Sequence, residues 1–155
     1  MSEGRQHPAH HPVKERHNEP IIVFLTICSK DRKRILGCKD VVETVISAWI
    51  GARSWLAGRY IFMPDHIHLF CAPATSPAEP LKQWVRYWKN LASRSWPRAE
   101  EHPIWQRDFW DTQLRRSENY SSKWIYVADN AVRAGLVKRA EDWPFQGELN
   151  FLPWR

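Results

Sequence analysis

The sequence has few cysteines, and they form no recognisable pair. The three thiols, at Cys28, Cys38 and Cys71, are odd in number and far apart. Their spacing excludes a disulfide framework and a Cys-x-x-Cys zinc pair, which favours a reducing environment. No apolar run is long enough to span a membrane, no signal peptide is visible, and no segment repeats. We therefore expect a cytoplasmic protein that has no membrane partner.

The composition that is present indicates a basic, globular domain. The chain has 155 residues, 43% of them hydrophobic, which suits one domain with a core of its own. Its net charge is +6 and its pI is about 9.5, so it attracts polyanions. Ten tryptophans are unusually many, and such rings could either fill the core or stack on bases.

A pair of histidines is the most informative feature of the chain. His66 and His68 follow a Met63-Pro64-Asp65 turn in the stretch RYIFMPDHIHLFCAP. Successive side chains of a strand alternate between its faces, so the two imidazoles share one face. Neutral imidazoles spaced in this way can bind one divalent metal, and by themselves they would suit Zn²⁺. The alternative is two surface histidines at the end of a hairpin.

Hydrophobic periodicity predicts four strands and three helices. The expected order is strand, helix, strand, strand, helix, strand, helix, over Ile21–Ser29, Asp40–Leu56 (with Gly58 past its end), Tyr60–Phe62, His66–Ala72, Ala78 or Leu81 to Arg94, Phe109–Leu114 and Ser117–Ala134. The first six spell β-α-β-β-α-β, the ferredoxin-like arrangement. We therefore predict an α+β fold: an antiparallel sheet with helices on one face, the other face open for ligands, and an extra C-terminal helix. Residues 1–20 are expected to form an irregular arm, 21–137 the main domain, and 138–155 a tail packed on it.

The last predicted helix separates two tyrosines. Tyr120 lies on the apolar arc, whereas Tyr126 lies on the polar arc one turn from Asn130. Free phenol has a pKa of about 10, and a nearby cation or metal favours the phenolate. Attack by such a phenolate on a phosphodiester would leave a covalent phosphotyrosine, and the Asn130 side-chain oxygen could be a third metal ligand. A surface tyrosine without a role is the alternative.

Basic residues gather in three places that could contact DNA phosphates. They are Arg32, Lys33 and Arg34 after the first strand, Lys82, Arg86 and Lys89 on one flank of the second helix, and Lys123 and Arg133 on the last helix. A solvated surface is the simpler interpretation of each.

Three segments together resemble the HUH single-tyrosine transposases of the IS200/IS605 kind, and most of all the REP-associated tyrosine transposases. They are MPDHIHLF (Met63–Phe70), WQRDFWDTQLRR (Trp105–Arg116) and YVADNAVRAGLV (Tyr126–Val137). The resemblance implies that Tyr126 is the nucleophile, that His66, His68 and Asn130 bind Mg²⁺ or Mn²⁺, and that the substrate is single-stranded DNA with a REP-like hairpin. It implies cleavage to a 5′-phosphotyrosine and a free 3′-OH. Ala131 stands where the family usually has proline, on the core arc.

Two other classes share parts of this pattern. A non-catalytic RRM-like module has the same order of elements, but it needs stacking aromatics on its central strands, and the RNP pattern is absent. A relaxase or rolling-circle initiator shares the paired histidines and the tyrosine, but in other orders or with further domains. Both a monomer and a homodimer remain open, because in dimeric relatives the tyrosine helix can serve the histidines of the partner.

Overall fold

The computed structural model describes His10, Val13 and residues 21–115 and 119–152. Its helices and strands follow the chain as β1 (Val23–Cys28), α1 (Lys39–Gly51), β2 (Trp55–Phe62), β3 (His66–Pro73), α2 (Leu81–Arg94), β4 (Trp110–Gln113), α3 (Tyr120–Ala128), α4 (Asn130–Arg133) and β5 (Gln146–Glu148). Most of the predicted arm, at residues 1–20, lies outside the described residues, as do the predicted start of the last helix at Ser117 and the final three residues of the tail.

The strands form one five-stranded sheet in the order β4-β1-β3-β2-β5, and every neighbouring pair is antiparallel. The predicted ferredoxin-like α+β architecture is therefore confirmed. β5 is an addition from the stretch predicted to be a packed tail, where it pairs with β2 at the edge of the sheet. β3 lies at the centre, and its register with β1 sets Thr26 opposite His68 and Cys28 opposite His66.

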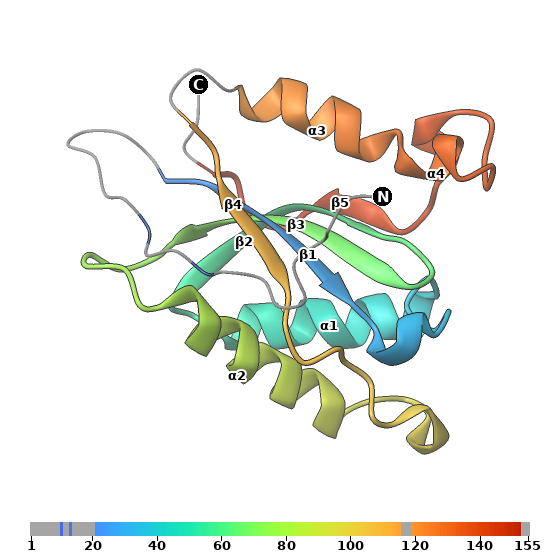
Figure 1. The fold of residues 1–155 in the computed structure, drawn as a ribbon, viewed down its shortest axis with the longest axis horizontal. Coiled ribbons are helices and arrows are strands. Elements are labelled where there is room, and N and C mark those ends of the chain that lie inside the picture. The colour runs from blue at the N-terminus through green and yellow to red at the C-terminus, as the bar shows by residue number, and fades with distance from the viewer. Residues whose placement is uncertain (1–9, 11–12, 14–20, 116–118, 153–155) are drawn as a thin grey trace, which may run out of the picture.

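Helices cover both faces of the sheet (Figure 1). α1 and α2 pack on one face, against inward residues of β1 such as Leu25 and Ile27. α3 lies over the opposite face, where Tyr120 and Val127 pack with Phe70 of β3. The prediction that the second face of the sheet is open was wrong, because the apolar side of the last helix packs on that face.

The tryptophans serve mainly the core. Trp55, Trp84 and Trp88 are at most 1% exposed. The indole N–H of Trp84 donates to the carbonyl of Ala52 at 2.8 Å, and Trp88 meets Trp49 edge to face at 5.8 Å. These rings sit between the sheet and the α1–α2 layer, so they are not a base-stacking surface.

Two predicted boundaries were wrong for identifiable reasons. α1 ends at Gly51, and the next apolar residues belong to β2, where Trp55 is buried. The helical spacing of apolar residues continues by coincidence into the strand. Gly58 is therefore not a helix end but a strand residue. A Cβ at Gly58 would come within 2.6 Å of Leu152 and 2.8 Å of the Tyr120 hydroxyl, so glycine permits a close approach here.

The last predicted helix, Ser117–Ala134, is in fact two helices with a break at Asp129. Asp129 has φ −80° and ψ 0°, and its N–H bonds to the Tyr126 carbonyl at 3.3 Å, in the manner of a tight last turn. On either side of the break, the predicted apolar arc still faces the core and the predicted polar arc still faces outward: Val127 and Ala131 are buried, whereas Tyr126 is exposed. Ala131, the departure from the family pattern, is fully buried on the core arc as predicted.

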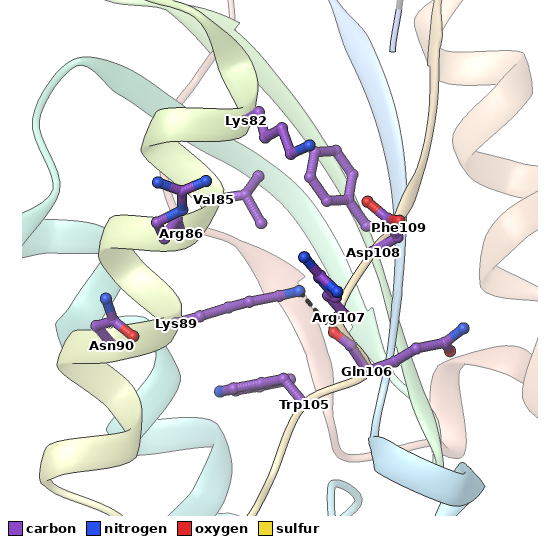
Figure 2. A pocket seen from close by; sticks show the side chains of 10 residues that line it. All are labelled: Lys82, Val85, Arg86, Lys89, Asn90, Trp105, Gln106, Arg107, Asp108 and Phe109. Atoms are coloured by element: carbon purple, nitrogen blue, oxygen red, sulfur yellow. Dashed lines mark hydrogen bonds between the residues drawn. The ribbon is translucent and has the colours of Figure 1, made fainter. Parts of the chain in front are cut away.

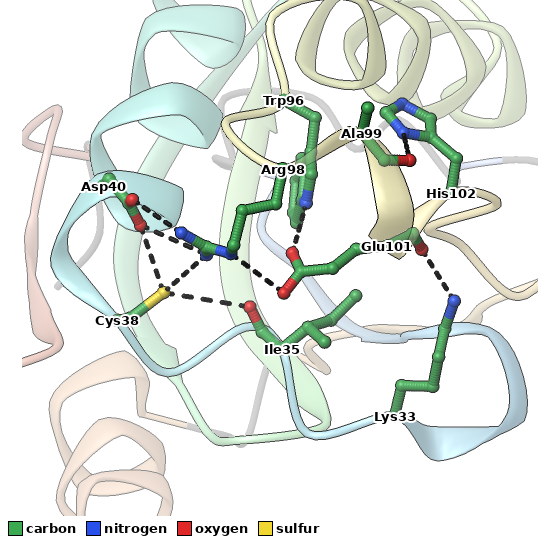
Figure 3. Close-up of polar contacts among 9 residues, drawn as sticks. All are labelled: Lys33, Ile35, Cys38, Asp40, Trp96, Arg98, Ala99, Glu101 and His102. Atoms are coloured by element: carbon green, nitrogen blue, oxygen red, sulfur yellow. Dashed lines mark hydrogen bonds and ion pairs between the residues drawn. The ribbon is translucent and has the colours of Figure 1, made fainter.

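A polar network fixes the loop after α2 to the start of α1 (Figure 3). The Arg98 guanidinium reaches Asp40 at 2.8 Å and Glu101 at 2.9 Å, while the Trp96 indole donates to Glu101 at 2.8 Å. The Arg98 contact lowers the pKa of Asp40. This network holds the chain that leads into Trp105–Phe109 and β4. None of the helices in the described ranges has the length and apolar character to cross a membrane.

Candidate metal and tyrosine site

The two histidines lie together on the face of β3 that α3 covers. Their ring centroids are 4.7 Å apart at an interplanar angle of 74°. Ile67, between them, is fully buried in the opposite layer. The alternation of the strand thus places both imidazoles on one face, as the sequence pattern predicted.

Each imidazole uses its Nδ1 atom for a contact that orients the ring. His66 Nδ1 lies 2.8 Å from Asp65 Oδ1, and His68 Nδ1 lies 3.0 Å from Thr26 Oγ1. Phe24 stacks on the His68 ring with centroids 5.1 Å apart. Among the described residues, the side-chain hydrogen bonds of both rings are made by Nδ1. Metal-binding histidines are typically held in this way, with one nitrogen fixed and the other available.

Burial keeps His68 neutral. The pKa of His68 is lowered to about 3, mainly by desolvation and also by the charges of His66 and Arg133. A hydrogen bond with the Leu25 backbone acts in the opposite direction. Because only a neutral imidazole can bind a metal, this environment suits a ligand.

The two tyrosines of α3 have opposite environments. Tyr120 is 4% exposed, and its hydroxyl accepts the backbone N–H of Arg59 at 2.9 Å. Burial raises the pKa of Tyr120 to about 12, which disfavours its phenolate. Tyr126, by contrast, is 68% exposed, and the Arg133 guanidinium stacks over its ring at 4.3 Å. The phenol that is accessible to a large substrate is therefore that of Tyr126.

Asn130 begins α4 just after the break. Its side-chain Nδ2 donates to the carbonyl of Val127 at 2.7 Å, which satisfies one of the free carbonyls at the end of α3. This bond uses the amide nitrogen and leaves the side-chain oxygen free to accept or to coordinate. The local geometry is thus compatible with the predicted ligand role.

Arg133 connects the two halves of the site. No described hydrogen bond or ring contact joins the Tyr126 side chain to either imidazole. The charge of Arg133 nevertheless reaches His68, while its guanidinium covers Tyr126 and donates to the Tyr126 carbonyl at 3.1 Å. Histidines, tyrosine and arginine therefore belong to one region of the molecule.

The donor set fits a metal that the substrate helps to bind. Among the described residues, no group of three His, Cys, Asp or Glu side chains could hold an ion. If the Asn130 oxygen joins the two imidazoles in binding a divalent ion, several positions around that ion stay open for other ligands. Phosphate oxygens and water could fill these positions, which suits Mg²⁺ or Mn²⁺ better than a closed structural zinc site.

The predicted DNA-binding residues differ in their availability. Lys33 is engaged, since its ammonium donates to the carbonyl of Glu101 at 2.7 Å (Figure 3). It also donates to the carbonyl of Pro103 at 2.9 Å. Lys89 is 8% exposed and does not lie on a solvated flank as predicted. Arg32 donates to Asp65 at 3.0 Å beside the histidine site. The others have exposed positions: Arg34, Lys82, Arg86, Lys123 and Arg133.

Sequence reasoning missed the residues that orient the imidazoles. Asp65 was within the recognised MPDHIH stretch, but it was assigned only to the turn. Its pKa is lowered by its hydrogen bonds with His66 and Arg32, although burial acts in the opposite direction. Thr26 gave no signal, because only the β1–β3 register brings it opposite His68.

The covered face argues against the RRM-like alternative. Phe70, the aromatic residue on that face of β3, is 1% exposed and packs against Tyr120 and Trp124. Phe24 is partly covered by His68 and Phe70. The central strands therefore offer no free stacking surface of the kind that such modules use.

The structure places a histidine pair on an inner antiparallel strand and an exposed tyrosine on a late helix over the same face. The resemblance to the HUH single-tyrosine class implies this arrangement. Comparison with known proteins leads to one group within that class. The chain is 26% identical to "Putative REP-associated tyrosine transposase" of Haemophilus influenzae, over 80% of this chain and 77% of that protein. It is 28% identical to the REP-associated tyrosine transposase of Escherichia coli, over 56% of this chain and 50% of that protein.

Comparison of the fold with solved structures also leads to a REP-associated tyrosine transposase. A solved structure of a REP-associated tyrosine transposase bound to a REP hairpin superposes with a TM-score of 0.68, at 22% identity, covering 94% of this chain and 82% of that one. No protein-family model matches the chain. The chain is thus similar to REP-associated tyrosine transposases in sequence and in fold, which confirms the resemblance seen in its motifs.

Proposed function

We propose that the protein is a transposase or endonuclease that cleaves and rejoins single-stranded DNA at hairpin-containing ends. Tyr126 is the nucleophile, and His66, His68 and Asn130 hold Mg²⁺ or Mn²⁺. The observation that carries the proposal is the pair of imidazoles on one face of β3, each oriented through its Nδ1 atom, under the helix that bears the exposed Tyr126.

The reaction is a transfer of a phosphodiester to tyrosine. The Tyr126 hydroxyl oxygen attacks the phosphorus and loses its proton to solvent. The bond from phosphorus to the 3′ oxygen breaks, and that oxygen takes up a proton to become a free 3′-OH. The 5′ phosphate stays on Tyr126 as a phosphotyrosine. Attack by another 3′-OH reverses the steps and rejoins a strand without ATP.

The chain's own residues have distinct roles in this scheme. Asp65 and Thr26 hold the imidazoles at a fixed orientation, and the break at Asp129 sets Asn130 one turn from the nucleophile. The cationic Arg133, which lies over the Tyr126 ring, can stabilise charge that develops on the phosphate. A bound divalent metal would supply polarisation of the scissile phosphate.

The hairpin as substrate rests on the relatives. The solved neighbour is bound to a REP hairpin, and the relatives of this chain carry the same family name. We extend this substrate class to the present chain, with a palindromic, REP-like hairpin beside the cleaved strand. The net charge of +6 supports a polyanionic partner.

A covalent adduct tests the proposal directly. Single-stranded DNA carrying REP-like hairpins is incubated with the protein and Mn²⁺, and a slower-migrating protein–DNA species is sought on a denaturing gel. We expect the wild type and a Tyr87→Phe variant to form the adduct. Tyr87 is a matched control, because it is an exposed tyrosine on α2. Tyr126→Phe, the His66→Ala and His68→Ala double variant, and EDTA treatment should each abolish the adduct.

Two outcomes would contradict the assignment. An adduct that persists in Tyr126→Phe but disappears in Tyr120→Phe would transfer the nucleophile to the buried phenol. DNA binding that needs no metal and yields no cleavage, over a set of hairpins, would favour a binding module instead.

A further inference from the structure

A second concave surface lies away from the paired histidines, between α2 and the segment Trp105–Phe109 that leads into β4 (Figure 2). We call it the α2 cleft. Its volume is about 520 Å³. Lys82, Arg86 and Lys89 project from α2, and Arg107 comes from the opposite wall. Basic side chains therefore flank the cleft on both sides.

The acidic residue of the cleft does not cancel this charge. Asp108 also lines it, and its carboxylate lies 3.4 Å from the His10 Nε2 atom. The lining has four basic side chains against this one carboxylate, so its net charge is positive. Burial lowers the pKa of Lys89 to about 8, so this ammonium is retained at neutral pH even though it is almost enclosed.

The aromatic residues of the cleft are already committed to packing. The Phe109 ring is 3% exposed, stacks with His10 at 4.3 Å and lies 5.7 Å from the Lys89 ammonium. Trp105 meets Trp88 and Trp96 edge to face. The Phe109 ring therefore has no free face on which a base could stack. Charge is the main feature that the cleft offers to a ligand.

The cleft lies on the opposite face of the sheet from the histidines, but its wall at Gln106 is only two chain segments away from the histidine strand. The Gln106 backbone N–H donates to the carbonyl of Cys28 at 3.0 Å, and Cys28 pairs with His66 in the sheet. Two strand spacings, roughly 10 Å, separate Gln106 from His66. A strand that leaves the histidine site over this edge would meet the α2 cleft within a few nucleotides.

From these observations we propose that the α2 cleft binds the phosphodiester backbone of single-stranded DNA that flanks the cleaved bond, independently of its sequence. Cations on both walls of this cleft of about 520 Å³ can flank one strand. The flanking position rests on the proposed function, but the binding of single-stranded DNA by the cleft does not.

Salt-dependent binding of a featureless strand tests the cleft. The probe is fluorescein-labelled dT₃₀, which has neither hairpin nor sequence information, and its affinity is measured by anisotropy from 50 to 300 mM NaCl. Each phosphate contact that is lost should reduce the slope of log K against log salt by roughly 0.7. The K82Q/R86Q/R107Q variant should therefore lose about 2 from the slope and at least ~10-fold in affinity at low salt. Lys89 is left in place because it bonds to the Gln106 carbonyl inside the fold.

A matched control removes the same charge elsewhere. The K39Q/R53Q/R94Q variant also loses three exposed cations, none of which lines the cleft. It should keep nearly the full slope. Circular dichroism and thermal unfolding check that both triple variants remain folded. If the two variants lose slope equally, or if the cleft variant keeps the wild-type slope, the proposal is wrong.

Two further arms identify the ligand and separate this proposal from the catalytic one. Inorganic phosphate at matched ionic strength should compete weakly; displacement of dT₃₀ by millimolar phosphate would make the cleft a small-anion site and overturn the proposal. The His66→Ala and His68→Ala double variant should keep the slope contributed by the cleft. Absence of any covalent adduct would refute the proposed function while leaving the cleft result intact.

Discussion

At the scale of single residues, the orientation of the imidazoles decides whether the site can hold a metal. Thr26 contacts His68 Nδ1 at 3.0 Å, so it fixes which ring nitrogen faces the proposed metal. Thr26→Val keeps the shape but removes this contact. We expect Mn²⁺ affinity, measured by titration calorimetry, to fall by about 10-fold or more, as is usual when the outer contact of a metal-binding histidine is removed.

The control for this substitution is Thr44→Val. Thr44 bonds only to the carbonyl of Asp40 on the exposed side of α1, so its loss should leave Mn²⁺ affinity unchanged. Equal Mn²⁺ affinities of the wild type and Thr26→Val would show that the ring needs no such support.

At the scale of elements, the packing of α3 on β2 depends on one glycine. A Cβ at Gly58 would come within 3 Å of Leu152 and the Tyr120 hydroxyl. Gly58→Ala should therefore displace α3 and the segment after β5, and lower the free energy of unfolding by about 1–3 kcal/mol. Gly51→Ala is the control, because its new Cβ would meet Leu91 at an ordinary 3.6 Å. Urea denaturation measures both, and similar stabilities for the two variants would contradict the role of Gly58.

The sequence was most informative about elements whose hydrophobic period is unambiguous. The apolar stripe of α2 follows from helical spacing over Leu81, Trp84, Val85, Trp88 and Leu91. The first four are buried, and Leu91 is partly buried against the same core. The end of α1 was missed because Trp55 and Leu56 extend the helical spacing into a strand. The break at Asp129 was missed because its sequence carries no glycine or proline to mark it.

The candidate site was predictable where its residues are close in sequence. The shared face of His66 and His68 follows from strand alternation, and the separation of Tyr120 from Tyr126 follows from helical alternation. The contact of Thr26 with His68 depends on the long-range pairing of β1 with β3, which one sequence does not reveal. The burial of Lys89 could not be predicted either, because the segment that covers it comes later in the chain.

At the scale of the whole molecule, the position of Arg133 bears on whether one chain builds the complete site. Its guanidinium covers Tyr126, and its charge acts on His68 of the same chain. We therefore expect a mixture of Tyr126→Phe protein with the His66→Ala and His68→Ala double variant to form no adduct. Denaturing gels of the mixture, beside each variant alone, provide the measurement.

Recovery of the adduct in that mixture would show a site shared between two subunits. Size-exclusion chromatography with light scattering distinguishes a stable dimer from a transient exchange of helices. A Tyr87→Phe protein mixed with the double variant supplies the positive control, since it retains a complete site.

The carboxylate of Asp65 has two basic neighbours, His66 through one oxygen and Arg32 through the other. If a phosphate draws the Arg32 guanidinium away, the full charge of Asp65 is left to the imidazole, which becomes a stronger electron donor. Occupancy by a polyanion and occupancy by a divalent ion would then reinforce each other, and thermodynamic linkage requires the effect to be the same in both directions.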